Sequence, residues 1–126
     1  MSRPLIRKVD CVQLPVPDLD AGIAFYGRLG HEVVWRRPTS AGLRLPDTDA
    51  ELVLQTERPD PEADLLVDDA DASVERFVAS VERFVAAGGP AVVEPFDIEI
   101  GRCAVVADPW GNRLVLLHLS KGRLSE

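Results

Sequence analysis

The chain has 126 residues, a formal net charge of −7 and an apolar fraction of 46%. Its length is that of one compact domain, residues 1–126, and its apolar fraction argues against disorder. The acidic balance excludes a nucleic-acid partner, because phosphate binding needs clustered lysine and arginine. No apolar run reaches the roughly 18 residues of a membrane span, and the first residues carry no apolar signal core. We therefore expect no membrane partner and a cytoplasmic protein, in which Cys11 and Cys103 are buried thiols.

The first half of the chain is predicted to form a strand, a helix and three further strands. Alternating apolar residues predict the first strand over residues 9–16. Asp18 is expected to cap the N-terminus of the helix, and Gly30 its C-terminus. The buried stripe of this helix is expected to hold Leu19, Ile23, Tyr26 and Leu29 or Phe25. Proline-containing turns then separate three strands, expected over residues 31–36, 41–45 and 50–56.

The same order of elements repeats after a polar stretch at residues 57–61. A strand around residues 64–67 and a helix precede three strands, expected over residues 90–96, 101–107 and 113–118. Residues 16–23 align with residues 67–74 at an offset of 51, with Asp18 matched to Asp69. This self-similarity predicts a βαβββ module written twice in the chain.

A shorter repeat lies within the second predicted helix. The sequence SVERFVA at residues 73–79 is followed at once by a second copy at residues 80–86. Seven residues make about two helical turns, so one copy lengthens the helix by about 10 Å without moving its apolar residues to another face. These residues are Val74, Phe77, Val78, Val81, Phe84 and Val85. We expect the extra turns to extend past the sheet or to loop out locally, and a neutral duplication is favoured over a functional one.

The turn Asp108-Pro109-Trp110-Gly111-Asn112 predicts a hairpin of the last two strands. This turn, the paired modules, LPVPDLD at residues 14–20, Phe25-Tyr26 and Leu29-Gly30 together resemble the vicinal oxygen chelate superfamily, which includes glyoxalases, bleomycin-resistance proteins and extradiol dioxygenases. The resemblance covers about residues 9–119. It implies an α+β fold in which two βαβββ modules, residues 6–57 and 62–119, form a half-barrel cleft. It also implies a homodimer, in which a second protomer often completes the cleft.

Enzymes of this family hold a divalent metal on the first and last strands of each module. The resemblance places these positions at Cys11, Val53, Glu62 and Val115. Two of them carry no donor atom, so a metal would have only Cys11 and Glu62, where catalytic sites normally use three protein ligands. Neighbouring donors at Glu51, Gln55 and Asp64 leave a relocated site open, but two residues along a strand move a ligand by roughly 6–7 Å. No cofactor is therefore expected, and the alternative is a divalent metal such as Zn, Ni, Fe or Mn.

The residues expected to line the cleft combine apolar walls with polar groups, as small-molecule pockets do. They are Cys11, Gln13, Arg44, Glu51, Val53, Gln55, Glu62, Asp64, Phe96, Trp110 and Val115, with Trp35 as a further candidate. The acidic members favour a cationic ligand if they face a shared cleft. The histidines, His31 and His118, are expected to be solvated or hydrogen-bonded at the surface rather than metal ligands.

The leading hypothesis is a dimeric small-molecule-binding protein that sequesters its ligand without a catalytic metal. The alternative is a metal-dependent lyase, isomerase or dioxygenase of the same superfamily, so the sequence leaves catalytic activity open and identifies no catalytic residue. A third hypothesis is a structural or interaction protein that uses the extended second helix as a contact surface. The sequence does not identify the ligand, because this fold by itself specifies no chemistry.

Overall fold

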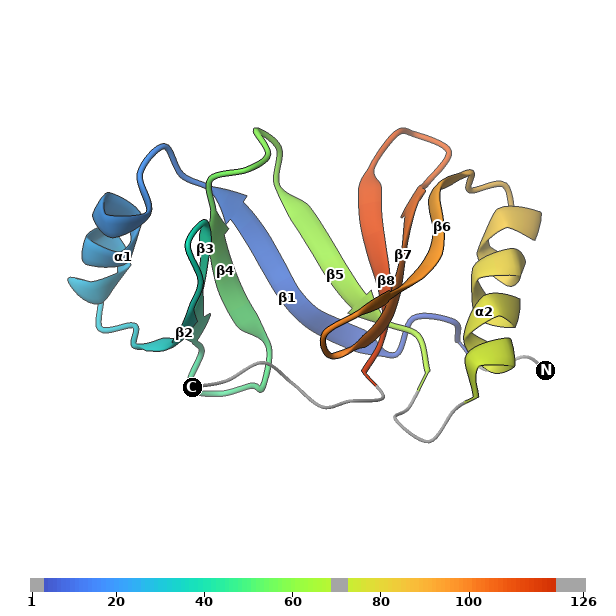
Figure 1. Ribbon diagram of the computed structural model, residues 1–126, viewed down its shortest axis with the longest axis horizontal. Coiled ribbons are helices and arrows are strands. Elements are labelled where there is room, and N and C mark those ends of the chain that lie inside the picture. Colours follow the sequence, from blue (N-terminus) through green and yellow to red (C-terminus); the bar gives the residue numbers. More distant parts are fainter. Residues whose placement is uncertain (1–3, 69–72, 120–126) are drawn as a thin grey trace. The chain divides into compact units, whose positions relative to one another are not determined.

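The computed structural model describes residues 4–68 and 73–119, and these form two compact units (Figure 1). The first unit holds residues 10–63. The second holds residues 64–68 and 73–119 together with residues 4–9. Both contain strands and one helix, so the predicted α+β class is confirmed. None of the helices in the described ranges is long and apolar enough to cross a membrane.

Five elements build the first unit: β1 (Lys8–Pro15), whose first two residues belong to the second unit, α1 (Leu19–Gly27), β2 (Val33–Arg36), β3 (Ser40–Arg44) and β4 (Glu51–Gln55). The strand order is β2-β3-β4-β1, with antiparallel pairs except for the parallel pair of β4 and β1. One face of these strands packs against α1 through a core of Leu19, Ala41, Leu43 and Leu54. Because side chains alternate across a strand, Cys11 and Gln13 of β1 lie on the opposite face from Leu14. The first module therefore has the predicted βαβββ order.

The caps of α1 are partly as predicted. The Asp18 side chain accepts a hydrogen bond from the backbone N–H of Ala21 at 3.1 Å, which confirms the N-cap. The predicted C-cap at Gly30 is wrong, because the helix ends at Gly27 and Arg28 is its C-cap. Gly30 instead takes a φ of +94° in the turn beyond the helix, a conformation that favours glycine.

The predicted buried stripe of α1 holds only in part. Leu19 is buried, and Ile23 and Tyr26 are partly buried against the same core. Leu29 is 62% exposed and Phe25 is 50% exposed. The early end of the helix removes Leu29 from the helical face, and Phe25 lies on the outside, edge-on to Tyr26.

The second unit repeats the order with β5 (Glu62–Leu66), α2 (Val74–Ala86), β6 (Ala91–Ile98), β7 (Gly101–Ala107) and β8 (Arg113–His118). The first two residues of β5 belong to the first unit. The order of the strands is β5-β8-β7-β6. One face carries an apolar cluster of Leu66, Cys103, Val105, Val115, Leu117 and Leu119. In both units the helix lies against the strands of its own module (Figure 1).

Helix α2 runs without a break through both SVERFVA copies. Ser73 is its N-cap and accepts a hydrogen bond from the N–H of Arg76 at 3.1 Å. The helix has 13 residues against nine in α1, so it is longer by about one turn rather than two. Asp69, the residue that the repeat matched to Asp18, lies outside the described residues.

The predicted apolar face of α2 is buried only along its middle. Phe77 and Val81 are buried, whereas Val74 and Val85 are 45% and 43% exposed. Phe77 stacks on the ring of His118, with centroids 6.0 Å apart. The predicted surface position of His118 is wrong: its side chain is 1% exposed, because β8 turns it toward the helix.

The hairpin of β7 and β8 confirms the predicted turn. The Asp108 carboxylate accepts hydrogen bonds from the N–H groups of Trp110 and Asn112 and from the Asn112 side chain. These bonds, the Asn112 side chain first, hold the pKa of Asp108 below its ordinary value. Gly111 has a φ of +88°, as a turn of this sequence requires.

Candidate ligand-binding site

An apolar wall lies on the face of the first unit opposite α1. Cys11, Trp35 and Val53 pack together there, and each is buried. The indole of Trp35 lies against Gly42, where a side chain would occupy the same space. Its Nε1–H donates to Oε1 of Glu51 at 2.8 Å. The wall is therefore fixed in position by packing on β3 and by a hydrogen bond to β4.

A polar network continues this face beyond Gln55, the last residue of β4. The Gln55 side chain is buried and turns back into the connection that follows it. Its Oε1 accepts hydrogen bonds from the backbone N–H of Glu57 at 2.7 Å and of Arg58 at 2.8 Å. Its Nε2 donates to the carbonyl of Arg58 at 2.9 Å. Gln55 thus holds the backbone of Arg58 in place, and its amide atoms are occupied in doing so.

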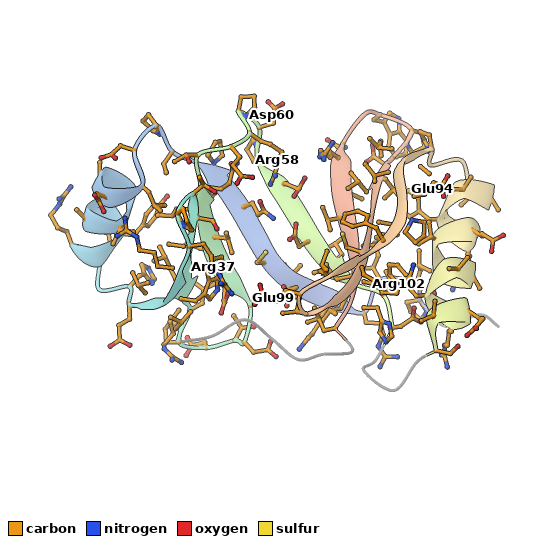
Figure 2. The ribbon with its side chains drawn as sticks, in the orientation of Figure 1. Arg37, Arg58, Asp60, Glu94, Glu99 and Arg102 are labelled. Atoms are coloured by element: carbon orange, nitrogen blue, oxygen red, sulfur yellow. The ribbon has the colours of Figure 1, made fainter. Side chains whose placement is uncertain are left out.

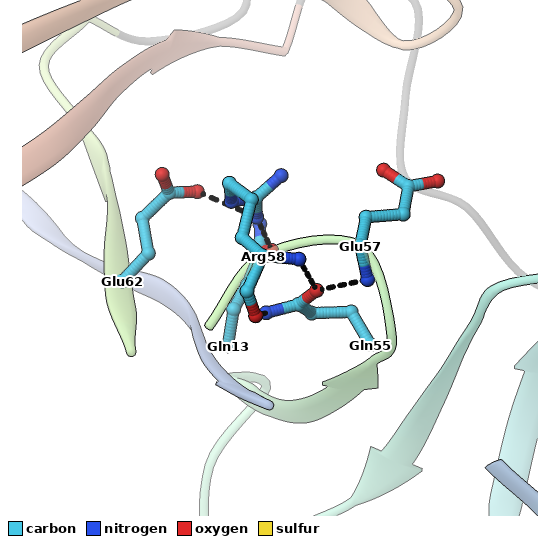
Figure 3. A network of polar contacts seen from close by, with 5 residues as sticks. All are labelled: Gln13, Gln55, Glu57, Arg58 and Glu62. Carbon is cyan, nitrogen blue, oxygen red and sulfur yellow. Dashed lines mark hydrogen bonds and ion pairs between the residues drawn. The ribbon is translucent and has the colours of Figure 1, made fainter. Parts of the chain in front are cut away.

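The Arg58 side chain reaches from this connection to the strands (Figures 2 and 3). Its Nη2 donates to Oε1 of Gln13 on β1 and to Oε2 of Glu62, the first residue of β5, at 3.2 Å. The Glu62 side chain is 3% exposed and that of Arg58 is 34% exposed. The network therefore joins a buried carboxylate to a guanidinium that solvent can reach.

Arg58 is the site residue that sequence reasoning missed. The sequence pattern of residues 57–61 indicates only a polar connection. A signal was present, because Arg58 is the single cation of that stretch and stands four residues before Glu62. Such spacing favours an ion pair in a helix, but here a turn brings the two charges together instead.

Within the first unit, the structure leaves one predicted cleft residue, Arg44, outside the site. Arg44 is exposed and pairs with Glu32 at 3.6 Å, apart from the network. Four further predicted cleft residues are part of the second unit: Asp64 is buried on β5, Val115 is buried in its apolar cluster, and Phe96 and Trp110 are exposed. Trp110 is 83% exposed at the tip of its hairpin. The wall contains Cys11, Trp35 and Val53, Glu51 is hydrogen-bonded to Trp35, and the network contains Gln13, Gln55 and Glu62.

The donors of this face do not fit a catalytic divalent metal. Cys11 and Val53 pack in an apolar cluster under Trp35. Glu62 faces the guanidinium of Arg58, a fixed positive charge that repels a metal cation. No group of three or more His, Cys, Asp or Glu side chains with metal-binding geometry occurs in residues 4–68 and 73–119. The residues of this face therefore do not form a catalytic metal centre.

The chain matches the family model described as Glyoxalase/Bleomycin resistance protein/Dioxygenase superfamily over residues 8–116. The match spans both βαβββ modules, so the chain belongs to this superfamily and the predicted resemblance is confirmed. No curated protein sequence matches the chain.

Several solved structures share the fold. Methylmalonyl-CoA epimerase from Mycobacterium tuberculosis is 19% identical with a TM-score of 0.72, and the match covers 94% of this chain and 91% of that one. The Mn(II)-bound glyoxalase from Novosphingobium aromaticivorans is 24% identical with a TM-score of 0.66, and 96% and 42% of the two chains are covered. An extradiol ring-cleaving dioxygenase from B. fuscum is 22% identical with a TM-score of 0.65, and 92% and 33% are covered. The chain spans less than half of the last two proteins, and identities this low establish the fold alone.

Proposed function

We propose that the chain is a small-molecule-binding protein of the glyoxalase and bleomycin-resistance type that works without a catalytic metal. The observation that carries this proposal is the ion pair of Arg58 with Glu62. Glu62 stands where the family resemblance implies a metal ligand, and here a side chain of the same protein supplies the positive charge.

The surroundings of the ion pair support binding. The apolar wall of Cys11, Trp35 and Val53 belongs to the same face as Gln13, which is paired in register with Val53. An apolar wall beside a few fixed polar groups is the usual composition of a small-molecule site. Held in place before a ligand arrives, such groups lower the entropic cost of binding. The proposed activity is therefore reversible sequestration of a small molecule.

The alternative is a metal-dependent lyase, isomerase or dioxygenase. It draws support from the fold neighbours, which include an epimerase, a Mn(II)-bound glyoxalase and a ring-cleaving dioxygenase. The two hypotheses differ in metal content. Protein purified without chelator should carry only substoichiometric Zn, Ni, Fe and Mn by elemental analysis, and its melting temperature should be unchanged by EDTA. One bound metal ion per chain, lost together with stability in EDTA, would contradict the metal-free proposal.

Binding itself is tested by a thermal-shift screen of small molecules that includes acidic, neutral and cationic compounds, among them cationic glycopeptides. A ligand of the native state raises the melting temperature by mass action. At least one compound should produce a concentration-dependent rise. A screen without any such rise would contradict sequestration.

We further infer a homodimer that resides in the cytoplasm. Family resemblance supports the dimer, and the state of Cys11 and Cys103 supports the location, because both are buried and neither forms a disulfide. Light scattering during size-exclusion chromatography should give twice the mass of the chain. A monomer at micromolar concentration would contradict the dimer.

A further inference from the structure

Hydrogen bonds hold Arg58 in place at both its backbone and its guanidinium. Two hydrogen bonds with the Gln55 side chain hold the Arg58 backbone, a third holds the neighbouring N–H of Glu57, and Gln13 and Glu62 hold the guanidinium (Figure 3). A long, flexible side chain held at both ends has already lost much of its rotational freedom. Arg58 is thus prepared to bind a ligand at little further entropic cost.

The guanidinium also has N–H donors that make no hydrogen bond within the described residues. The guanidinium of arginine has five N–H donors, and the side-chain hydrogen bonds of Arg58 all leave from Nη2. Nε has no hydrogen-bond partner within the described residues but is itself buried, so the donors that a ligand can reach are those of Nη1, from which no hydrogen bond leaves there. Unused donors beside an apolar wall bind an acceptor strongly, because low polarity strengthens a hydrogen bond.

The contact with Glu62 uses only one nitrogen of the guanidinium. One carboxylate oxygen meets one nitrogen at 3.2 Å, whereas the strongest arginine–carboxylate pairs are bidentate. The buried carboxylate keeps Arg58 charged and in position. A cationic ligand would have to compete with Arg58 for Glu62, while Glu51 already accepts a hydrogen bond from Trp35. A carboxylate ligand, which Glu62 repels, would have to bind through the guanidinium donors that Glu62 does not use.

We propose that Arg58 binds the carboxylate of a small organic acid, through guanidinium donors that the protein itself leaves unused. This inference rests on the proposed function and names its ligand class. It replaces the cationic ligand expected from the acidic cleft residues, because Glu51 and Glu62, two of those carboxylates, already have hydrogen-bond donors.

Three compounds of the same shape test the ligand class: benzoate, its neutral isostere benzamide and its cationic isostere benzamidine. Isothermal titration at constant ionic strength should show benzoate bound at least about tenfold more tightly than the other two, the discrimination expected of a charge-assisted hydrogen bond. Equal or tighter binding of benzamidine would overturn the assignment. So would the absence of benzoate binding at millimolar concentration.

Substitution of Arg58 locates the contact. Arg58→Gln should weaken benzoate binding about tenfold or more. The matched control is Arg36→Gln, which removes another ion-paired arginine of the first unit and should leave benzoate affinity unchanged. An unchanged affinity in Arg58→Gln, or an equal loss in both variants, would contradict the contact.

A measurement on the unsubstituted protein guards against a folding defect in Arg58→Gln. In ¹⁵N-labelled protein the arginine Nε–H resonances can be followed directly, and Arg58→Lys assigns the signal of Arg58. Benzoate should shift that signal and benzamidine should not, and a signal unmoved by benzoate would refute the proposal.

Tight binding of benzamidine alone, in metal-free protein, would overturn the carboxylate assignment while leaving metal-free sequestration intact. A stoichiometric metal would instead remove the proposed function.

Discussion

Gly42→Ala should dislodge the indole of Trp35 from the wall of the candidate site. A Cβ atom at position 42 would lie 2.0 Å from Nε1, 2.4 Å from Cε2 and 2.7 Å from Cδ1 of Trp35. Contacts this short cannot persist, so either the indole leaves its place or the backbone of β3 moves. Overpacking of this kind costs about 1–3 kcal/mol, and loss of the hydrogen bond to Glu51 adds about 1 kcal/mol. We expect a loss of about 2–4 kcal/mol in the free energy of unfolding, or roughly 8–16 °C in melting temperature.

Tryptophan fluorescence reads this displacement directly. Trp35 is 7% exposed and Trp110 is 83% exposed, so Trp110→Phe leaves a single buried reporter. In that background Gly42→Ala should shift the emission to longer wavelength and lower the midpoint of urea unfolding. Gly27→Ala is the matched control, because a Cβ there meets nothing within 4 Å and should not lower stability. A Gly42→Ala protein within about 0.5 kcal/mol of its parent, with unchanged emission, would refute the packing argument.

Two further predictions concern buried and turn polar groups of the second unit. His118→Leu should raise the free energy of unfolding by about 1–2 kcal/mol, because both ring nitrogens are buried without a hydrogen-bond partner in the described residues. Chemical denaturation measures the change, and a loss of stability would instead show that the imidazole makes a necessary contact beside Phe77. At Asp108 the lowered pKa in the folded state means that the ionised carboxylate contributes stability above its ordinary pKa, which is lost as the pH falls through the folded value. Asp108→Asn should therefore be less stable than the parent at pH 7 and should lose this difference in acid, and a difference that grows on acidification would contradict the turn contacts.

The local structure of the chain follows closely from its sequence. The predicted strands over residues 101–107 and 113–118 coincide with β7 and β8, because turn residues with distinct conformational preferences mark their ends. The cap at Asp18 was equally predictable, since a short acceptor before an apolar stripe satisfies the open N–H groups of a helix. Burial proved harder to predict, as Leu29 and His118 show, because exposure depends on where a helix stops and on what packs over it.

The sequence by itself determined the two βαβββ modules and the superfamily, since both depend on local patterns repeated along the chain. It also showed that Val53 and Val115 carry no metal-binding atom. Only the tertiary structure revealed what stands beside Glu62, because the pairing with Arg58 depends on a turn that Gln55 holds through three hydrogen bonds. The same holds for the wall, where Trp35 on β2, Gly42 on β3 and Glu51 on β4 meet across three strands. Contacts between strands depend on register and side-chain conformation, which no single segment of the sequence specifies.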